Sequence, residues 1–382
     1  MKICMKVVIA IDSFKGSMTS AEAGHAAAEG IRRVCPDAEI LVRPVADGGE
    51  GTVTALCEGL GGSFVDVPVT GPIGDTVTAR YAVVHNGKTA VMEMAAAAGL
   101  PLVPTEKRNP LVTTTYGVGE MIRHALEQGC RDFIIGIGGS ATNDGGAGML
   151  QALGFSFLRG DGSTVPAGAA GLGELARIDT KHVLPVLKEC RFRIACDVTN
   201  PLCGENGCSA VFGPQKGADE DMVCEMDRNL RHFAEITRAL YPDAAADFPG
   251  AGAAGGLGFA FSVFLGGELE RGVEVILSAT DLDSHVRDAD IVITGEGKLD
   301  AQTAMGKAPA GVAAAAKKYG KPVIAFAGAV GKDAHLLHSC GIDACFSIVR
   351  GAVSLEEAMR RENAMSNLAD TAEQVFRTLH LL

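Results

Sequence analysis

Short apolar runs alternate with helix-periodic segments in the first sixty residues. Apolar runs at 7–11 and 40–45 flank a helical segment at 20–35, which Pro36 ends, and a second helix is expected after Gly51. Apolar strands that alternate with helices are typical of parallel sheets whose two faces are both covered. This part of the chain therefore predicts the opening of a parallel α/β sheet.

The last hundred residues repeat the alternation. The elements expected here are strands at 291–294, 323–327 and 344–349, an Ala-rich helix at about 309–319, and a closing helix from Ser354 onward. Neither chain end has enough strands for a sheet with both faces covered, so we expect the two ends to form one domain together. The predicted fold class is α/β, with a discontinuous Rossmann- or flavodoxin-like domain built from residues 1–61 and 286–382.

The middle of the chain has a different character. Strand-like runs at 64–69 and 77–84 are followed by His85-Asn86-Gly87-Lys88 and a third run at 89–94. The Asn-Gly dipeptide favours a type I′ hairpin, so antiparallel pairing is expected here. Further elements are expected as helices at 113–128 and 219–241 and strands at 133–137 and 192–196. We interpret residues 62–285 as an inserted second α/β domain and expect the active site in the cleft between the two domains.

Composition and charge narrow the list of partners. The 382 residues carry a formal net charge of −12, which would repel nucleic acid and anionic lipid, so neither is expected as a partner. The eleven cysteines are dispersed without a Cys-x-x-Cys pair, and the start has too short an apolar run for a signal peptide. Both observations predict a cytoplasmic protein. The uncharged stretch at 249–267 is broken by seven glycines and is interpreted as a loop that leads into a buried helix, not as a membrane span.

Glycine stands beside polar and charged residues in six short segments. They are Asp12-Ser13-Phe14-Lys15-Gly16-Ser17, Ala46-Asp47-Gly48-Gly49-Glu50-Gly51-Thr52, GIGGSATNDGG at 136–146, Cys196-Asp197-Val198-Thr199-Asn200-Pro201, Gly213-Pro214-Gln215-Lys216-Gly217-Ala218, and TGEGKLDAQTAMGK at 294–307. The first, second and last follow strands of the proposed end-built sheet, where open α/β sheets bind their ligands. Each segment alone is more typical of an ordinary turn, but together they indicate a phosphate or nucleotide site.

The residue types in these segments suit phosphate recognition. Glycines free backbone N–H groups, hydroxyl groups add donors, and lysines add positive charge. Carboxylates beside phosphate would be unfavourable unless a cation stood between them, and Mg²⁺ takes carboxylate and phosphate oxygens together. Mg²⁺ together with a nucleotide or another phosphate ligand is therefore expected.

Familiar nucleotide signatures are absent or out of context. Gly306-Lys307 is followed by Ala308, so the chain lacks a P-loop. Gly250-x-Gly252-x-x-Gly255 matches the dinucleotide pattern, but no strand precedes it. Two alternatives stay open on the residues alone. One is an NAD-dependent oxidoreductase of a small hydroxy acid, and the other is a non-catalytic phosphometabolite-binding protein.

Seven motifs taken in order resemble the bacterial type I glycerate kinase family. They are DSFKGS, ADGGEGT, GIGGSATNDGG, ACDVTNP, VFGPQKGA, PGAGAAGGLG and TGEGKLDAQTAMGK, and the resemblance extends from Asp12 to Val312. It implies a discontinuous Rossmann-like domain with an inserted domain. It also implies transfer of the ATP γ-phosphoryl group to D-glycerate, giving 2-phosphoglycerate. The expected partners are thus glycerate and ATP, and a homo-oligomer stays open.

Roles can be assigned to individual residues from their chemistry. The catalytic candidates are Asp197 as first choice for the carboxylate that accepts the substrate hydroxyl proton, Asp144 as second choice, and Lys15 for phosphate charge. The candidates for substrate or phosphate binding are Ser13, Ser140, Thr142, Asn143, Asn200, Lys216 and Lys307. The candidates for Mg²⁺, directly or through water, are Asp47, Glu50, Glu296 and Asp300.

Structural alternatives accompany these roles. Asp197 and Asn200 could form an Asx-turn before Pro201. Glu296 and Asp300 could cap the helix that follows them. Lys15 could be a solvated loop lysine.

Overall fold

The computed structural model describes residues 5–379. The chain divides into two compact units. A terminal unit comprises the residues up to Asp47, Thr54–Gly62, and the chain from Val273 onward, and a central unit comprises Gly48–Val53 and Ser63–Gly272. The predicted boundaries lie at 61/62 and 285/286, so they differ from this division mainly in the segments 48–53 and 273–285.

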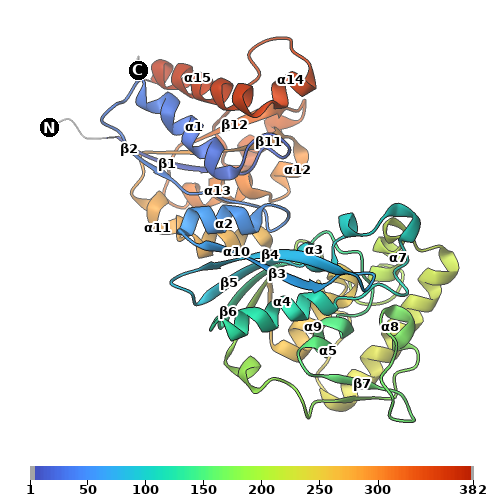
Figure 1. Ribbon diagram of the computed structural model, residues 1–382. Coiled ribbons are helices and arrows are strands. Elements are labelled where there is room, and N and C mark those ends of the chain that lie inside the picture. The colour runs from blue at the N-terminus through green and yellow to red at the C-terminus, as the bar shows by residue number, and fades with distance from the viewer. Residues whose placement is uncertain (1–4, 380–382) are drawn as a thin grey trace. The chain divides into compact units, whose positions relative to one another are not determined.

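A five-stranded parallel sheet forms the middle of the terminal unit (Figure 1). Its strands are β1 (Lys6–Ile11), β2 (Glu39–Val42), β11 (Ile291–Leu299), β12 (Val323–Val330) and β13 (Ala344–Ser347). The order β13-β12-β11-β1-β2 is that of flavodoxin-like sheets. The predicted α/β fold class with a sheet built from both chain ends is confirmed.

Strand β11 extends further than the sequence suggested. A strand was expected at 291–294 with a loop after it. The strand instead continues to Leu299, because Lys298 and Leu299 still pair with Ala329 and Val330 of β12. Glu296 is consequently a strand residue. Its side chain is held by the sheet and not by a loose glycine-rich loop.

Helices cover the sheet of the terminal unit. They are α1 (Ser20–Arg32), α2 (Thr52–Leu60), α10 (Gly272–Ala279), α11 (Leu282–Arg287), α12 (Ala301–Ala304), α13 (Ala308–Lys317), α14 (Leu355–Met359) and α15 (Arg361–Leu379), with a 3-10 helix at Ala334–Cys340. Helices α1 and α15 pack side by side on one face, where Ile31 and Phe376 join the apolar side chains of β1 and β11 (Figure 1). The first and last helices of the chain therefore share one core.

The central unit contains a six-stranded mixed sheet. Its strands are β3 (Ser63–Thr70), β4 (Thr76–Val84), β5 (Thr89–Glu93), β6 (Asp132–Gly136), β9 (Arg191–Ala195) and β10 (Glu268–Glu270), in the order β10-β9-β6-β5-β4-β3. The predicted hairpin joins β4 and β5, and Asn86 and Gly87 both adopt the positive φ of a type I′ turn. Strands β5, β6, β9 and β10 are parallel, so their carboxyl ends share one edge.

Helices and a small two-stranded sheet complete the central unit. The helices are α3 (Ala95–Ala98), α4 (Tyr116–Glu127), α5 (Ala147–Ala152), α6 (Ala169–Leu172), α7 (Cys208–Phe212), α8 (Glu220–Leu240) and α9 (Ala253–Leu265), the 3-10 helices are Leu100–Leu102, Thr105–Lys107, Pro185–Glu189 and Pro214–Lys216, and the small sheet pairs β7 (Ser156–Leu158) with β8 (Arg177–Asp179). Helix α9 is the buried helix expected after the glycine-rich loop, since Phe259 and Phe261 are fully buried in the core.

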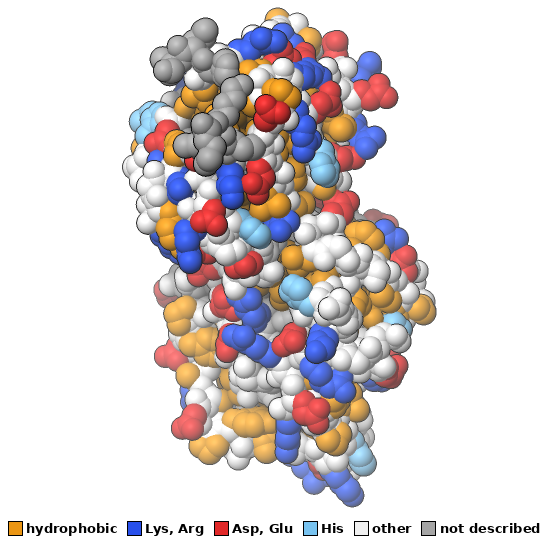
Figure 2. All heavy atoms as spheres, turned by 90° about the vertical axis from the view of Figure 1, so that its left-hand side faces the viewer, with side chains coloured by type: hydrophobic (Ala, Val, Ile, Leu, Met, Phe, Trp, Pro, Cys, Tyr) orange, Lys and Arg blue, Asp and Glu red, His pale blue; other side chains and the backbone are white. Residues whose placement is uncertain are grey.

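The surface has no large area of one charge sign on the face that Figure 2 shows, where Lys and Arg side chains are interspersed with Asp and Glu. Within residues 5–379, no helix combines the length and the apolar character that a membrane crossing would require.

A close helix contact joins the two chain ends and can be tested. Gly30 of α1 faces Ala369 of α15, and a Cβ at position 30 would lie 1.9 Å from the Ala369 carbonyl oxygen. Gly30→Ala should therefore destabilise the protein by about 1–3 kcal/mol, although alanine is the better helix former. The measurement is the free energy of unfolding from urea titrations. Gly351→Ala is the control, because a Cβ there meets nothing within 4 Å. Equal stability of Gly30→Ala and wild type would contradict the close packing of α1 and α15.

Candidate active site

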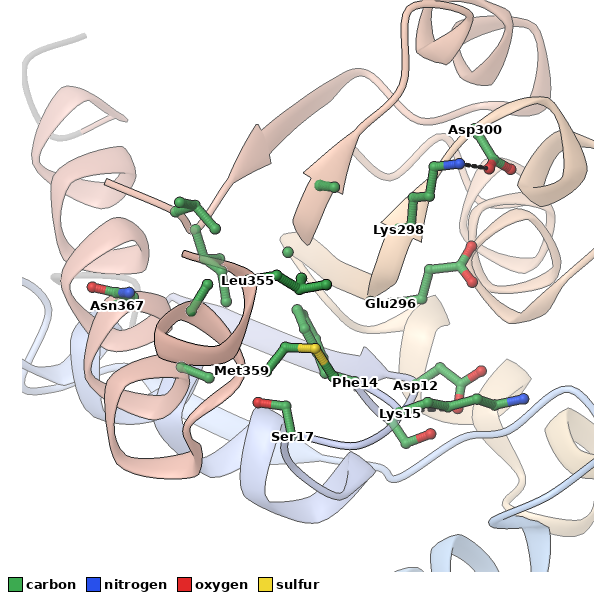
Figure 3. A pocket seen from close by; sticks show the side chains of 18 of the residues that line it. Asp12, Phe14, Lys15, Ser17, Glu296, Lys298, Asp300, Leu355, Met359 and Asn367 are labelled. Carbon is green, nitrogen blue, oxygen red and sulfur yellow. Dashed lines mark hydrogen bonds and ion pairs between the residues drawn. The ribbon is translucent and has the colours of Figure 1, made fainter. Parts of the chain in front are cut away.

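The carboxyl ends of the strands in the terminal unit surround a pocket of about 510 Å³ (Figure 3). The chain leaves β1 toward β2 on one side, whereas β11, β12 and β13 continue on the other side. The strand order thus reverses between β1 and β11, and open α/β sheets bind ligands at such a reversal. The pocket lies there, because the residues directly after β1 and at the end of β11 line it together with parts of α14 and α15.

A tight turn after β1 presents Lys15 at the pocket. The backbone N–H of Ser17 donates to the carbonyl oxygen of Phe14 at 2.8 Å, and Gly16 takes a φ of +78°, which glycine adopts without steric cost. Phe14 is buried beneath the turn, whereas Lys15 is exposed. Helix α1 starts directly afterwards with Thr19 and Glu22 in a capping box. Ser13 and Lys15, both predicted site residues, therefore lie on a loop that is fixed at each end.

Three carboxylates influence one another at the charged end of the pocket. Asp12 is 6% exposed, and burial together with the charges of Asp47 and Glu296 raises the pKa of its carboxyl to about 7. Burial also raises the pKa of Glu296, although a hydrogen bond from the Thr303 hydroxyl at 2.6 Å opposes the shift. Such a concentration of buried negative charge is unfavourable unless a cation joins it.

Two lysines accompany these carboxylates. Lys307 Nζ lies 3.6 Å from Glu296 Oε2, and Lys298 Nζ lies 2.9 Å from Asp300 Oδ2. Asp300 also caps α12 by accepting from the N–H of Gln302, which is the structural role considered for it from the sequence. The hydrogen bond from Lys298 is the main reason why the pKa of Asp300 lies below its ordinary value. Asp300 lines the pocket with both its oxygens already in use.

The carboxylates at the pocket are compatible with an Mg²⁺ ion that takes its other ligands from a bound phosphate group and from water. Among the described residues, no group of three or more Asp, Glu, His or Cys side chains is arranged to hold a metal ion. Mg²⁺ is commonly held by one or two carboxylates and completes its shell with phosphate oxygens and water. Asp12, Asp47 and Glu296 offer such carboxylates at the pocket, and the repulsion that raises the pKa of Asp12 would be relieved by a cation.

Glu50 belongs to the central unit, unlike the other three predicted metal candidates. It is exposed, and its charge contributes to the raised pKa of Glu93, for which burial is the main cause. Glu93 ends β5 and accepts from the backbone N–H groups of Gly51 and Val53 at 3.1 and 3.0 Å. Glu93 thus fixes the glycine-rich segment at 48–53 to the edge of the central sheet.

Asp197 follows β9 at the same edge of the central sheet. Its side chain is exposed, and its Oδ1 accepts from the N–H of Gly272 at 3.0 Å. Asn200 donates from its amide to the carbonyl oxygen of Asn206 at 2.9 Å and so closes the loop after Pro201. Asp197 is therefore oriented by the backbone at a strand end while it keeps access to solvent.

Asp144 and Lys216 lie deep inside the central unit. The carboxylate of Asp144 accepts four hydrogen bonds, from the backbone and hydroxyl of Thr115 and from the N–H groups of Gly146 and Gly148. Lys216 is 2% exposed, and its Nζ donates to the carbonyl oxygen of Thr142 at 2.6 Å. Burial lowers the pKa of Lys216 to about 8. Both side chains are used to hold the glycine-rich loop that follows β6.

The same loop carries Ser140, Thr142 and Asn143, which are all buried. Asn143 Nδ2 donates to the hydroxyl of Ser209 at 2.9 Å. Thr142 Oγ1 and Asn143 Oδ1 are buried without a hydrogen-bond partner among the described residues. Orphan oxygens of this kind are costly and favour a bound polar group next to them.

Several residues of the site were missed from the sequence. Asp12 directly follows β1 and stands beside the predicted Ser13 and Lys15, so its position at a strand end was an available signal. Glu93 also ends a strand and could have been found in the same way. Leu355 and Met359 line the other end of the pocket, but an apolar residue on a predicted helix carries no such signal.

Comparisons with known proteins give one consistent result. A family model described as the glycerate kinase family matches residues 7–380. Glycerate 2-kinase of Escherichia coli K12 is 50% identical over 98% of both chains, and glycerate kinase of Bacillus subtilis 168 is 49% identical over 99% of this chain and 98% of its own. A crystal structure of a protein provisionally assigned as glycerate kinase 2, from Salmonella typhimurium LT2, superposes with a TM-score of 0.92 and 47% identity over 99% of both chains.

The raised pKa of Asp12 predicts an unusual dependence of stability on pH. The carboxyl binds its proton more tightly in the folded protein than in the unfolded chain, so protonation of Asp12 stabilises the fold. This contribution is fully present below about pH 4 and is lost as the pH rises toward 7. Asp12→Asn removes this loss and still accepts the hydrogen bond from the Ser13 N–H. At pH 8 without Mg²⁺ and nucleotide, the variant should be more stable than wild type by roughly 2–4 kcal/mol.

The measurement is the free energy of unfolding at pH 5 and pH 8 in the presence of a chelator. The difference between Asp12→Asn and wild type should shrink at the lower pH. A variant less stable than wild type at pH 8 would show that the ionised carboxylate stabilises the folded protein.

Proposed function

The chain belongs to the glycerate kinase family, and we propose that it transfers the γ-phosphoryl group of ATP to the 2-hydroxyl of D-glycerate, giving 2-phosphoglycerate. The observation that carries the chemistry is the pocket at the strand reversal, where Lys15 and Lys307 stand beside three carboxylates. The choice of the 2-hydroxyl follows the name of the Escherichia coli relative. The oxidoreductase and the non-catalytic binding protein find no support among the relatives.

Phosphoryl transfer requires positioning and neutralisation of charge more than covalent chemistry. In the proposal, Lys15 and Lys307 bind phosphate oxygens, and Ser13 adds a hydroxyl at the same end of the pocket. Asp12, Asp47 and Glu296 would hold Mg²⁺ directly or through water. When bound, Mg²⁺ supplies positive charge to the β- and γ-phosphates. Asp300 contributes by fixing Lys298 and the start of α12.

Asp197 is the proposed acceptor of the proton from the substrate hydroxyl. Its carboxylate is exposed at a strand end, and the N–H of Gly272 orients it by donating to Oδ1. Asp144 was the second choice from the sequence. Its carboxylate is fully buried and already accepts four hydrogen bonds, so we assign it a positioning role. The same reasoning makes Lys216 a positioning residue for the loop.

The glycerate site is proposed at the carboxyl edge of the central sheet. Ser140 and the orphan oxygens of Thr142 and Asn143 offer partners for hydroxyl or carboxylate groups or for a water that bridges to them. Asn200 fixes the neighbouring loop. The location of the complete active site between the two units stays a prediction.

The proposal places the protein in the cytoplasm. All ten described cysteines are free thiols, which a reducing compartment would preserve. The proposed partners are glycerate and ATP, and neither nucleic acid nor a membrane has a part in the reaction. A homo-oligomer stays open.

An assay of ADP release tests the function. With D-glycerate, ATP and Mg²⁺ the protein should release ADP, and without glycerate or without Mg²⁺ the release should fall to the background level. Phosphorus NMR of the product should show 2-phosphoglycerate. A product phosphorylated at the 3-hydroxyl would contradict the proposed position, and no glycerate-dependent ADP release would contradict the activity itself.

Replacement of Asp197 distinguishes a catalytic base from a residue that only stabilises a turn. Asp197→Asn can still accept from the Gly272 N–H but cannot take a proton, so turnover at saturating substrates should fall roughly 10²- to 10⁴-fold with little change in melting temperature. Asp161→Asn is a matched control, because Asp161 is an exposed turn aspartate that accepts from the N–H of Ser163. If Asp197→Asn keeps turnover within about threefold of wild type, as the control should, Asp197 is not the base.

A further inference from the structure

The pocket of the terminal unit has two chemically different ends (Figure 3). Asp12, Lys15 and Glu296 lie toward one end, and Leu355, Met359 and Asn367 lie toward the other. The lining also contains the apolar side chains of Ile348, Val349, Ala358 and Ala364. A ligand that fills the pocket must therefore combine a charged end with an apolar end.

The apolar end leaves large hydrophobic surface uncovered. Leu355 is 76% exposed and Met359 is 36% exposed, whereas Ile348 and Ala364 next to them in the lining are 2% exposed. Met359 packs close to the turn after β1, because a Cβ on Gly16 would lie 2.9 Å from its Cε. Two exposed apolar side chains over an apolar floor favour a flat apolar group between them.

Two polar groups at the same end could form hydrogen bonds with the edge of such an apolar ligand group. The side-chain amide of Asn367 has no hydrogen bond to any described residue and lines the pocket one helical turn after Ala364. The hydroxyl of Ser17, also in the lining, is buried without a partner among the described residues. A carboxamide presents a donor and an acceptor side by side, which is the complement of the donor and acceptor on adenine.

We propose that the end of the pocket formed by Leu355, Met359 and Asn367 is the subsite for the adenine base of the phosphoryl donor. The inference rests on the proposed function and deepens it, since it assigns the whole nucleotide to the terminal unit. The base packs against Leu355 and Met359, its polar edge meets the Asn367 amide, and the phosphates extend toward Lys15 and Lys307. The volume of about 510 Å³ is within the range of roughly 300–1,000 Å³ that is usual for pockets of small ligands.

Binding of two probes to the full chain tests the apolar part of the subsite. ADP contains the base, whereas pyrophosphate contains only the charged part. In calorimetry with Mg²⁺, Leu355→Ser and Met359→Ser should each weaken ADP binding about five- to twentyfold and leave pyrophosphate binding within about twofold of wild type. Both side chains are partly exposed, so the variants should remain folded.

Met305→Ser is the matched control for Leu355→Ser. Met305 is also a large apolar residue of the terminal unit and is 79% exposed, but it does not line the pocket. The control should bind ADP like wild type. ADP binding by Leu355→Ser and Met359→Ser within twofold of wild type would overturn the subsite, and so would an equal loss of ADP and pyrophosphate binding.

A change of base preference tests the role of Asn367. Asn367→Asp replaces the donor of the amide with a second acceptor, which suits the N–H groups of guanine better than adenine. The ratio of kcat/KM for ATP to that for GTP should fall about tenfold or more, while the KM for glycerate stays the same. Gln374→Glu makes the same amide-to-carboxylate change at an exposed position of α15 outside the lining and should leave the ratio unchanged.

The outcomes distinguish the inference from the proposed function. If wild type binds ADP in the expected way but does not phosphorylate glycerate, the proposed function fails and the subsite stands. If wild type phosphorylates glycerate but Asn367→Asp keeps the preference of wild type, the adenine contact at Asn367 is wrong.

Discussion

The parallel pairing of β1 with β11 is the contact on which the site depends. Val7 pairs with Ile291 and Ile11 with Gly295, so two strands separated by almost the whole chain run in the same direction side by side. Parallel pairing brings their carboxyl ends to the same edge. Asp12 and Lys15 after β1 thereby lie near Glu296 in the last part of β11, and the pocket forms where the strand order reverses. The contact of α1 with α15 supports this pairing from one face of the sheet.

The same geometry places carboxylates close together at the charged end of the pocket, which destabilises the folded protein. Burial and the neighbouring carboxylates raise the pKa of Asp12, which means that its ionised form destabilises the fold near neutral pH. The folded protein would be more stable with a well-packed apolar residue at this position. The persistence of a buried acid in such surroundings is typical of a functional site, where a ligand or cation supplies the missing favourable interaction.

The sequence predicted the elements of the fold better than the contacts of the site. Alternating strands and helices, together with Asn86-Gly87, sufficed for the terminal sheet and the central hairpin because these depend on local periodicity and turn chemistry. Ser13, Lys15 and Lys307 were predicted because they stand in glycine-rich segments, and all three line the pocket of the terminal unit. The extension of β11 through Glu296 could not be foreseen, since it depends on pairing with β12 and not on local propensity. Leu355 and Met359 escaped for a similar reason: only the fold places them at a pocket.

Lys216 shows why residue chemistry alone does not assign a role. A lysine in a glycine-rich segment suggests phosphate binding, but this ammonium group donates to the Thr142 carbonyl in a fully buried setting. Burial of a lysine is unfavourable, as its lowered pKa indicates, and the charge of Asp144 offsets only part of that effect. The role of Asp144 and Lys216 therefore follows from the backbone groups that they bind. Asp144 binds the N–H groups at the end of the loop after β6 and Lys216 binds a carbonyl in its middle, so Thr142 and Asn143 stay rigid with oxygens available for a polar group. In the proposed function, a loop fixed in this way needs little further ordering when a small hydroxy acid binds, and this is the contribution that positioning makes to phosphoryl transfer.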